Sequence, residues 1–163
     1  MASESCEIAS STMDDLSTPA SETTRDHSVH SMNWDQLKLA VSSCTACALC
    51  QTRKNTVFGV GDQQADWLFV GEGPGAREDE IGEPFVGQAG KLLDQMLAAI
   101  GLKRGDGVYI ANIVKCRPPS NRNPSDTEVS ACEPFLSRQI QLLSSCVSLT
   151  KPSKSSGYKA SSR

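Results

Sequence analysis

The sequence predicts an α/β fold, because two apolar, strand-like segments are separated by one amphipathic helical segment. Residues 67–70 (WLFV) form a continuous apolar run that stops at Gly71, and residues 107–114 (GVYIANIV) form a second run. Between them, residues 88–102 (QAGKLLDQMLAAIGL) repeat apolar side chains at helical spacing. A strand, a helix and a strand in this order predict a parallel βαβ unit.

The helices can be placed from their periodicity and their caps. In residues 32–41 (MNWDQLKLAV), apolar residues recur at helical spacing and Asn33 is a suitable N-cap. A further helix is expected from about Asp126 to Leu143, after a polar, proline-rich loop that ends in a capping box. The box pairs Ser125 with Glu128. In the helix between the strands, Gly101 is the expected stop, and one apolar face gathers Leu92, Leu93, Met96, Leu97 and Ile100.

Composition divides the chain into three parts. Residues 1–32 are rich in Ser and Thr and predict a disordered leader, residues 33–143 form the expected domain, and residues 144–163 form a polar tail. A domain of this kind normally continues with another strand, which the tail does not supply. We therefore expect an incomplete sheet, in a chain that is truncated or frame-slipped after about Leu143. Reading the coding DNA of codons 140–163 in all three frames would distinguish these cases.

Charge and hydropathy narrow the possible partners. The net charge is −3, but residues 1–35 hold seven acids and one base, which leaves 12 acids (19 − 7) and 15 bases (16 − 1) in residues 36–163. A mildly basic body is compatible with a polyanionic partner. No apolar stretch is long enough to cross a membrane, and the N-terminus does not resemble a secretory signal. We expect a cytoplasmic protein with no membrane partner.

The motif GEGPG at residues 71–75 follows the first strand directly. It lacks the GK[ST] ending of a phosphate-binding P-loop and does not fit GxGxxG. Acidic residues surround it, at Glu72, Glu78, Asp79, Glu80 and Glu83. Carboxylates suit water activation or a hydrogen bond to a neutral N–H, but they repel bare phosphate. With Phe85 nearby as an aromatic platform, this segment predicts binding of a base or a sugar.

Seven cysteines in a chain without a secretory signal point to metal binding or reactive thiols. Cys44 and Cys47 form a C-x2-C pair, and Cys116 and Cys132 form a second pair with fifteen residues between them. Four thiolates suit zinc or an iron–sulfur cluster, and spacing alone does not choose between them. Cys50 extends the first pair, as at the start of a ferredoxin motif. Buried, unligated thiols are the alternative.

Four segments in this order resemble the family 4 uracil-DNA glycosylases, the iron–sulfur type. They are CTACALCQTR, GEGPGAREDEIGEPFVGQAGKLLDQML, YIANIVKCRPPSNRNP and ACEPFL, and the resemblance runs from about Trp34 to Leu143. It implies a three-layer α/β/α sandwich with a four-stranded parallel sheet, incomplete in this chain. It also implies a monomer that removes uracil from single- or double-stranded DNA, and a [4Fe–4S] cluster on Cys44, Cys47, Cys116 and Cys132, with zinc as the alternative.

The resemblance assigns a role to each motif. The turn formed by Gly71, Gly73 and Gly75 would lie under the N-glycosidic bond, and Glu72 would position or activate water. A base must leave the double helix before its sugar bond is attacked, and the remaining roles follow from that extrusion. They are stacking on the uracil by Phe85, reading of its Watson–Crick edge by Asn112, support of the pocket or contact with the base by Glu78, and phosphate contacts by Lys115, Arg117 and Arg122.

One departure from the family pattern bears on activity. Family members continue with a strand of the VIVALG type and an HPS-like segment, whose histidine stabilises charge on the departing uracil. The two histidines here are His27 and His30, so we expect weak activity or none. Three other interpretations remain: a non-catalytic, four-cysteine DNA-binding module, a ferredoxin-like electron carrier that uses Cys50, and specificity for another damaged base.

Overall fold

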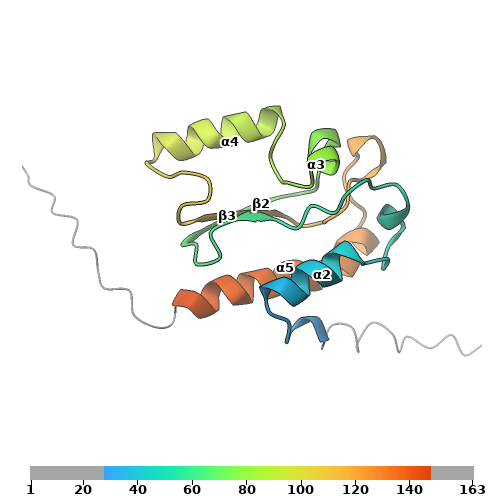
Figure 1. Ribbon diagram of the computed structural model, residues 1–163. Coiled ribbons are helices and arrows are strands. Elements are labelled where there is room, and N and C mark those ends of the chain that lie inside the picture. Colours follow the sequence, from blue (N-terminus) through green and yellow to red (C-terminus); the bar gives the residue numbers. More distant parts are fainter. Residues whose placement is uncertain (1–27, 148–163) are drawn as a thin grey trace, which may run out of the picture.

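The computed structural model describes residues 28–147, including the side chains of residues 28–144, and arranges them in three layers. A small sheet lies between helices that cover both of its faces (Figure 1). This confirms the predicted α/β class. Helices α3 (Ala76–Ile81) and α4 (Gln88–Ala99) cover the first face, and α2 (Trp34–Ser42) and α5 (Asp126–Val147) lie on the second. Two short 3₁₀ helices, η1 (Ala48–Gln51) and η2 (Pro119–Asn121), lie in the connections.

The sheet has three strands in the described part of the chain, in the order β1-β3-β2. Strands β2 (Trp67–Gly71) and β3 (Val108–Asn112) are parallel neighbours, as the βαβ prediction required. Strand β1 (Val60–Gly61) pairs with β3 in the antiparallel direction, so the expectation of an all-parallel sheet is wrong at this edge. A strand of two residues, one of them glycine, is too short to show a period of two, so the sequence did not predict it.

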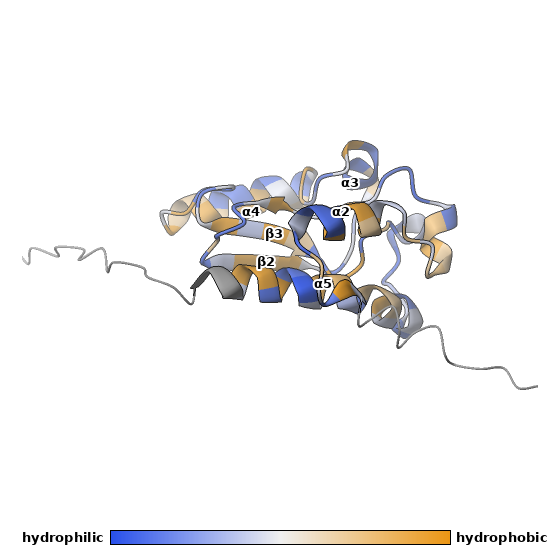
Figure 2. Ribbon diagram, turned by 60° about the horizontal axis from the view of Figure 1, so that its bottom comes forward, coloured by the Kyte–Doolittle hydropathy of each residue, from blue (hydrophilic) through white to orange (hydrophobic). Residues whose placement is uncertain are grey.

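Strand β3 is the centre of the core, and all five of its residues are buried. Val108 and Ile110 pack with Leu97 of α4, whereas Tyr109 and Ala111 pack toward α5. This alternation follows from the two-residue period of a strand. In Figure 2, β2 and β3 include strongly apolar positions, whereas apolar and polar positions alternate along α5. The period also places the next residue, Asn112, on the α4 side of the sheet.

The N-terminal caps predicted for α2 and α5 are present. The Asn33 side chain accepts a hydrogen bond from Gln36 N at 2.9 Å and begins α2. Before α5, Ser125 N donates to Glu128 Oε2 at 2.8 Å, and Glu128 N donates to Ser125 Oγ at 3.4 Å. Helix α5 continues to Val147, four residues beyond the predicted end. The caps therefore predicted the starts of these helices more accurately than periodicity predicted the end of α5.

The packed part of the chain begins earlier than residue 33. Val29 lies in the segment expected to be a disordered leader, yet it is 1% exposed and packs with Leu37 and Val41. Val29 has polar neighbours on both sides and belongs to no periodic apolar pattern, so this contact could not be predicted from the sequence. The rest of the predicted leader, residues 1–27, and the predicted tail beyond residue 147 lie outside the described residues.

Helix α4 lies where the sequence predicts it, but only part of its apolar face is buried. Leu97 is buried and Leu93 packs beside it, whereas Leu92, Met96 and Ile100 are between 58% and 64% exposed. The helix contacts a sheet of three strands with a narrow part of its apolar surface, and nothing else among residues 28–144 covers the remainder. Helix α3 is an element that the sequence did not predict, since its six residues contain five polar or small side chains and only one large apolar residue.

Candidate functional site

A pocket of about 300 Å³ lies beside the carboxyl ends of β2 and β3. Its walls come from the GEGPG turn, the start of α3, the loop before α4, α4 itself and the last residue of β3. Seven of its eight lining residues are residues that the sequence predicted for a ligand site, and Ala89 is the addition. The lining consists of Gly71, Glu72, Gly73, Gly75, Glu78, Phe85, Ala89 and Asn112. Segments separated by forty residues in sequence thus converge on one pocket.

The pocket depends on a close approach between Gly71 and two side chains. Gly71 is the register partner of Asn112 in the parallel pair. A Cβ on Gly71 would overlap Asn112 Oδ1 and would stand 2.7 Å from Phe85 Cζ. Because glycine has no Cβ, the amide and the aromatic ring share this space. Asn112 is 2% exposed, so its amide is held at the inner end of the pocket.

Backbone hydrogen bonds extend the strand pairing into the GEGPG turn. Ile113 N donates to Gly71 O at 2.8 Å, and Val114 N donates to Glu72 O at 3.2 Å. These bonds fix the turn against the segment that follows β3. The side chain of Glu72 is exposed beside the pocket, where a carboxylate can accept a hydrogen bond from water.

Phe85 occupies the left-handed region of backbone conformation, with φ of 56°. For a bulky residue this conformation costs about 1–3 kcal/mol and persists only when the surroundings impose it. Glu78 Oε1 accepts hydrogen bonds from Val86 N at 3.0 Å and Gly87 N at 2.9 Å. The Phe85 carbonyl also lies where a Cβ on Gly90 would stand, so glycine is required there. Glu78 thus holds the loop that carries Phe85.

Arg104 supports the same loop, and sequence reasoning did not identify it. Its guanidinium donates to Pro84 O at 3.0 Å and to Phe85 O at 2.9 Å. Asp94 of α4 accepts a third hydrogen bond from Arg104 Nε at 3.0 Å. Its position in a short connection between α4 and β3 resembles an ordinary surface arginine, so nothing local in the sequence signals this role. Only the fold brings residue 104 next to residue 85.

Of the three cationic residues predicted to meet phosphate, Lys115 does not lie at the surface. It is 1% exposed, and its ammonium donates to Asn112 O at 2.8 Å and to Gln139 Oε1 at 2.7 Å. Burial lowers the pKa of Lys115 to about 8. The phosphate role predicted for this residue is therefore wrong. Lys115 instead ties the end of β3 to α5.

The other two cationic residues remain accessible, in differing degrees. Arg122 donates to both Glu128 carboxylate oxygens, at 2.8 and 2.6 Å, so part of its charge is already balanced. Arg117 donates to Asn121 Oδ1 at 2.7 Å and is half-buried. Arg122 lines a second hollow, of about 110 Å³, between the GEGPG turn and the loop that follows β3. Their contact with phosphate stays a prediction.

The five cysteines whose side chains are described line one small pocket. They come from three segments: the loop after α2, the segment after β3, and α5. The Arg53 guanidinium donates to Cys116 Sγ at 3.1 Å, and Lys115 N donates to Cys132 Sγ at 3.3 Å. Among residues 28–144, no three His, Cys, Asp or Glu side chains stand in an arrangement that could hold a metal ion.

The donor set nevertheless suits a thiophilic metal group. Burial raises the pKa of the Cys116 thiol, and it raises the pKa of Cys132 to about 11. Without a metal, these thiols therefore stay protonated at neutral pH. Arg53 lowers the pKa of Cys116 in opposition to burial, and N–H donors of this kind stabilise bound thiolates. Thiols gathered from three segments, with such donors facing them, fit zinc or an iron–sulfur cluster.

The fold and the pocket define the class: an α/β domain whose ligand site opens at the carboxyl ends of parallel strands. Comparison with known proteins gives the family. The family model of the uracil DNA glycosylase superfamily matches residues 58–152, more than half of the chain. The chain belongs to the uracil DNA glycosylase superfamily.

Curated relatives agree with this assignment. The type-4 uracil-DNA glycosylase of Archaeoglobus fulgidus is 52% identical over 109 residues, which cover 67% of this chain and 54% of the relative. That of Sulfurisphaera tokodaii is 49% identical over 125 residues, 76% of this chain and 56% of the relative. That of Thermotoga maritima is 52% identical over 103 residues, 63% and 53% respectively. The chain thus spans about half the length of these relatives. No helix in residues 28–147 has the length and apolarity needed to cross a membrane.

Proposed function

We propose that this chain carries the base-recognition pocket of a uracil-DNA glycosylase, which hydrolyses the N-glycosidic bond of a deoxyuridine flipped out of DNA. The relatives named type-4 uracil-DNA glycosylases support the reaction class. The observation that carries the proposal is the placement of Asn112 and Phe85 against Gly71 in one pocket. An aromatic ring and an amide that line one pocket suit a flat, hydrogen-bonding ligand better than a phosphate.

Asn112 would select the base. A side-chain amide has both a carbonyl acceptor and an N–H donor, so it can pair with the N–H and a carbonyl of uracil together. Cytosine presents an amino group and an unprotonated nitrogen at the same edge, so an amide held in the orientation that pairs with uracil would leave buried polar atoms unpaired against it. Such a mismatch discriminates strongly because the unpaired groups are desolvated. Phe85 would contribute stacking, which tolerates any base.

The deoxyribose would lie over the GEGPG turn, with Glu72 beside the sugar. In this position the Glu72 carboxylate accepts a hydrogen bond from the water that attacks the anomeric carbon as the bond to the base breaks. Arg117 and Arg122 would meet the flanking phosphates of single- or double-stranded DNA. Glu78 and Arg104 would act indirectly, by holding Phe85.

The four cysteines Cys44, Cys47, Cys116 and Cys132 would hold a [4Fe–4S] cluster, with zinc as the alternative. When bound, the cluster would supply cross-linking of three chain segments rather than chemistry on the base. Cys116 follows Lys115 and lies four residues beyond Asn112, so the cross-link would stabilise the end of β3. Iron and sulfide analysis of the purified protein distinguishes the two. A colourless protein that contains zinc and no iron would contradict the iron–sulfur assignment and favour zinc.

The decisive experiment compares the protein with its Asn112→Ala and Asn112→Asp variants on single-stranded oligonucleotides that carry one uracil, thymine or cytosine. Binding is measured beside base release, so that recognition of the base and turnover are separated. We expect the protein to prefer uracil over cytosine, and each variant to lose at least about tenfold in uracil affinity. Asn123→Ala is the matched control, because the hydrogen bond recorded at Asn123 uses its backbone oxygen. Equal binding of all three bases, or unchanged uracil affinity in Asn112→Ala, would contradict the proposal.

A further inference from the structure

A short segment, residues 53–55, connects the cysteine pocket to the base pocket. At its start, the Arg53 guanidinium contacts Cys116 Sγ at 3.1 Å and Ser42 O, at the end of α2, at 3.2 Å. The two residues that follow turn away from the cysteines and run beside helix α3. Residues 53–55 therefore touch the proposed metal site at one end and the helix next to the GEGPG turn at the other.

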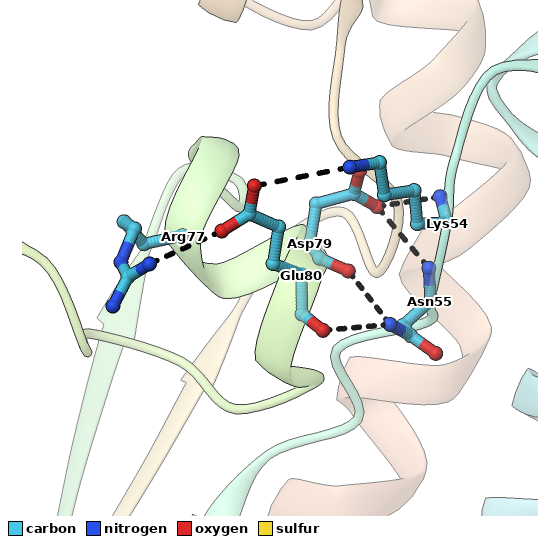
Figure 3. Close-up of polar contacts among 5 residues, drawn as sticks. All are labelled: Lys54, Asn55, Arg77, Asp79 and Glu80. Carbon is cyan, nitrogen blue, oxygen red and sulfur yellow. Dashed lines mark hydrogen bonds and ion pairs between the residues drawn. The ribbon is translucent and has the colours of Figure 1, made fainter.

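The backbone amides of residues 54 and 55 contact α3 through one buried carboxylate, that of Asp79. Lys54 N donates to Asp79 Oδ1 at 2.9 Å, and Asn55 N donates to the same oxygen at 3.3 Å. The Asn55 side chain returns the contact, because its Nδ2 donates to Asp79 O at 2.9 Å and to Glu80 O at 3.1 Å. Figure 3 shows Asp79 directed from α3 toward the backbone of residues 54 and 55.

Asp79 differs from its acidic neighbours in burial and in partners. It is 2% exposed, whereas the Glu80 side chain is 45% exposed and pairs with Lys54 Nζ at 3.8 Å and Arg77 at 3.2 Å. A buried carboxylate is costly unless hydrogen bonds stabilise it, and charge-assisted bonds from backbone amides are strong. The position of Asp79, and with it that of α3, is therefore tied to the backbone of residues 54 and 55.

Helix α3 also carries the residue that holds the pocket wall. Glu78 precedes Asp79, and its Oε1 accepts the Val86 and Gly87 amides at 3.0 and 2.9 Å. Those bonds help to keep Phe85 in its left-handed conformation. A shift of α3 would move the Glu78 carboxylate away from these amides. The strain at Phe85 would then be released, and the ring would leave its position against Gly71.

We propose that Asp79 is a positioning residue, which transmits the placement of the cysteine-bearing segment through α3 and Glu78 to Phe85. This inference deepens the proposed function, and it rests on that function for the identity of the ligand in the pocket. Asp79 touches neither substrate nor metal. Its removal loosens the base pocket while the cysteine pocket keeps its own contacts.

The test uses the protein with its metal group bound, and the variants Asp79→Ala and Asp79→Asn. Hydrogen–deuterium exchange reports the Val86 and Gly87 amides directly, and visible absorbance with metal analysis reports the metal site. In Asp79→Ala we expect exchange at residues 86–87 to accelerate by about tenfold or more, through more frequent local opening. Affinity for a uracil-containing oligonucleotide falls in parallel, whereas metal content and exchange in α2 stay unchanged. Asp79→Asn keeps one acceptor oxygen and gives an intermediate result.

Glu80→Ala is the matched control, because it removes a neighbouring carboxylate whose partners are exposed side chains. Unchanged exchange at residues 86–87 in Asp79→Ala, or an equal acceleration in Glu80→Ala, would overturn the inference. If Asp79→Ala does not fold, Asn55→Ala removes only the two Nδ2 bonds and must accelerate the same amides for the inference to stand. Failure of the unmodified protein to bind uracil would contradict the proposed function, and the exchange result would still decide the role of Asp79.

Discussion

Gly71 and Asn112 are direct partners across the parallel β2–β3 pair, and the Asn112 amide oxygen occupies the space that a side chain at residue 71 would fill. This relationship joins two motifs that are forty residues apart in sequence. It makes the base pocket a property of strand register, because a slip of one residue would turn Asn112 to the other face of the sheet.

Gly71→Ala should therefore damage the pocket more than the fold. The added methyl group would displace Asn112 and Phe85, and overpacking of this kind costs about 1–3 kcal/mol. We expect uracil affinity to fall by at least about tenfold, measured with a uracil-containing oligonucleotide. Gly105→Ala is the control: its Cβ would meet nothing within 4 Å, but its φ of 80° disfavours alanine. It should lower the free energy of unfolding, by about 1–2 kcal/mol, and leave uracil affinity unchanged. A loss of affinity in both variants would show that general destabilisation is responsible.

Arg104→Gln should weaken base binding from outside the pocket. The change removes the guanidinium that donates to the Pro84 and Phe85 carbonyls, so the strained conformation of Phe85 loses one of its supports. We expect about a tenfold loss of uracil affinity, and that loss should be smaller in a Phe85→Ala background, because coupled residues are not additive. Arg77→Gln, which removes an exposed arginine paired with Glu80, is the control. Full additivity of Arg104→Gln and Phe85→Ala would contradict the role given to Arg104.

Lys115 and Arg117 should respond differently to salt. Lys115 is buried, and Lys115→Met leaves Asn112 O and Gln139 Oε1 without their donor. We expect a loss of about 1–3 kcal/mol in the free energy of unfolding, measured by urea denaturation, and no change in the salt dependence of DNA binding. Arg117→Gln should instead reduce the slope of log affinity against log salt by about one, if Arg117 neutralises one phosphate. A reduced slope in Lys115→Met would instead show that Lys115 contacts a DNA phosphate.

The sequence was sufficient to predict the parts of the site that lie in one continuous motif, or in two motifs that strand register joins. The GEGPG turn, Phe85 and Asn112 converge as predicted, because a βαβ unit places the carboxyl ends of its strands together. The cap residues Asn33 and Ser125 were predictable for the same reason, since they act within four residues.

The sequence was insufficient where burial depends on a distant segment. Lys115 lies in a run with Arg117 that looks cationic and exposed, but Gln139 of α5 covers it. Asp79 lies among exposed acids, and only residues 54 and 55 distinguish it. Because each partner is more than twenty residues away, no local pattern could reveal these contacts.

The Arg122–Glu128 pair predicts a specific dependence of stability on pH. Hydrogen bonds from Arg122 and Ser125 lower the pKa of Glu128 to about 2, from an ordinary value of 4.5. A carboxyl group with a lowered pKa stabilises the folded state fully above its ordinary pKa, and the contribution disappears as the pH falls through the lowered value.

Glu128→Gln should therefore destabilise the protein at pH 7, by about 1–2 kcal/mol after allowance for the half-exposed guanidinium. The difference in unfolding free energy between the protein and the variant should stay constant from pH 7 to about pH 5, and it should shrink between about pH 4.5 and pH 2. Urea denaturation at each pH measures this difference directly, and effects common to both proteins cancel. A difference that grows on acidification would show that the ion pair does not stabilise the start of α5.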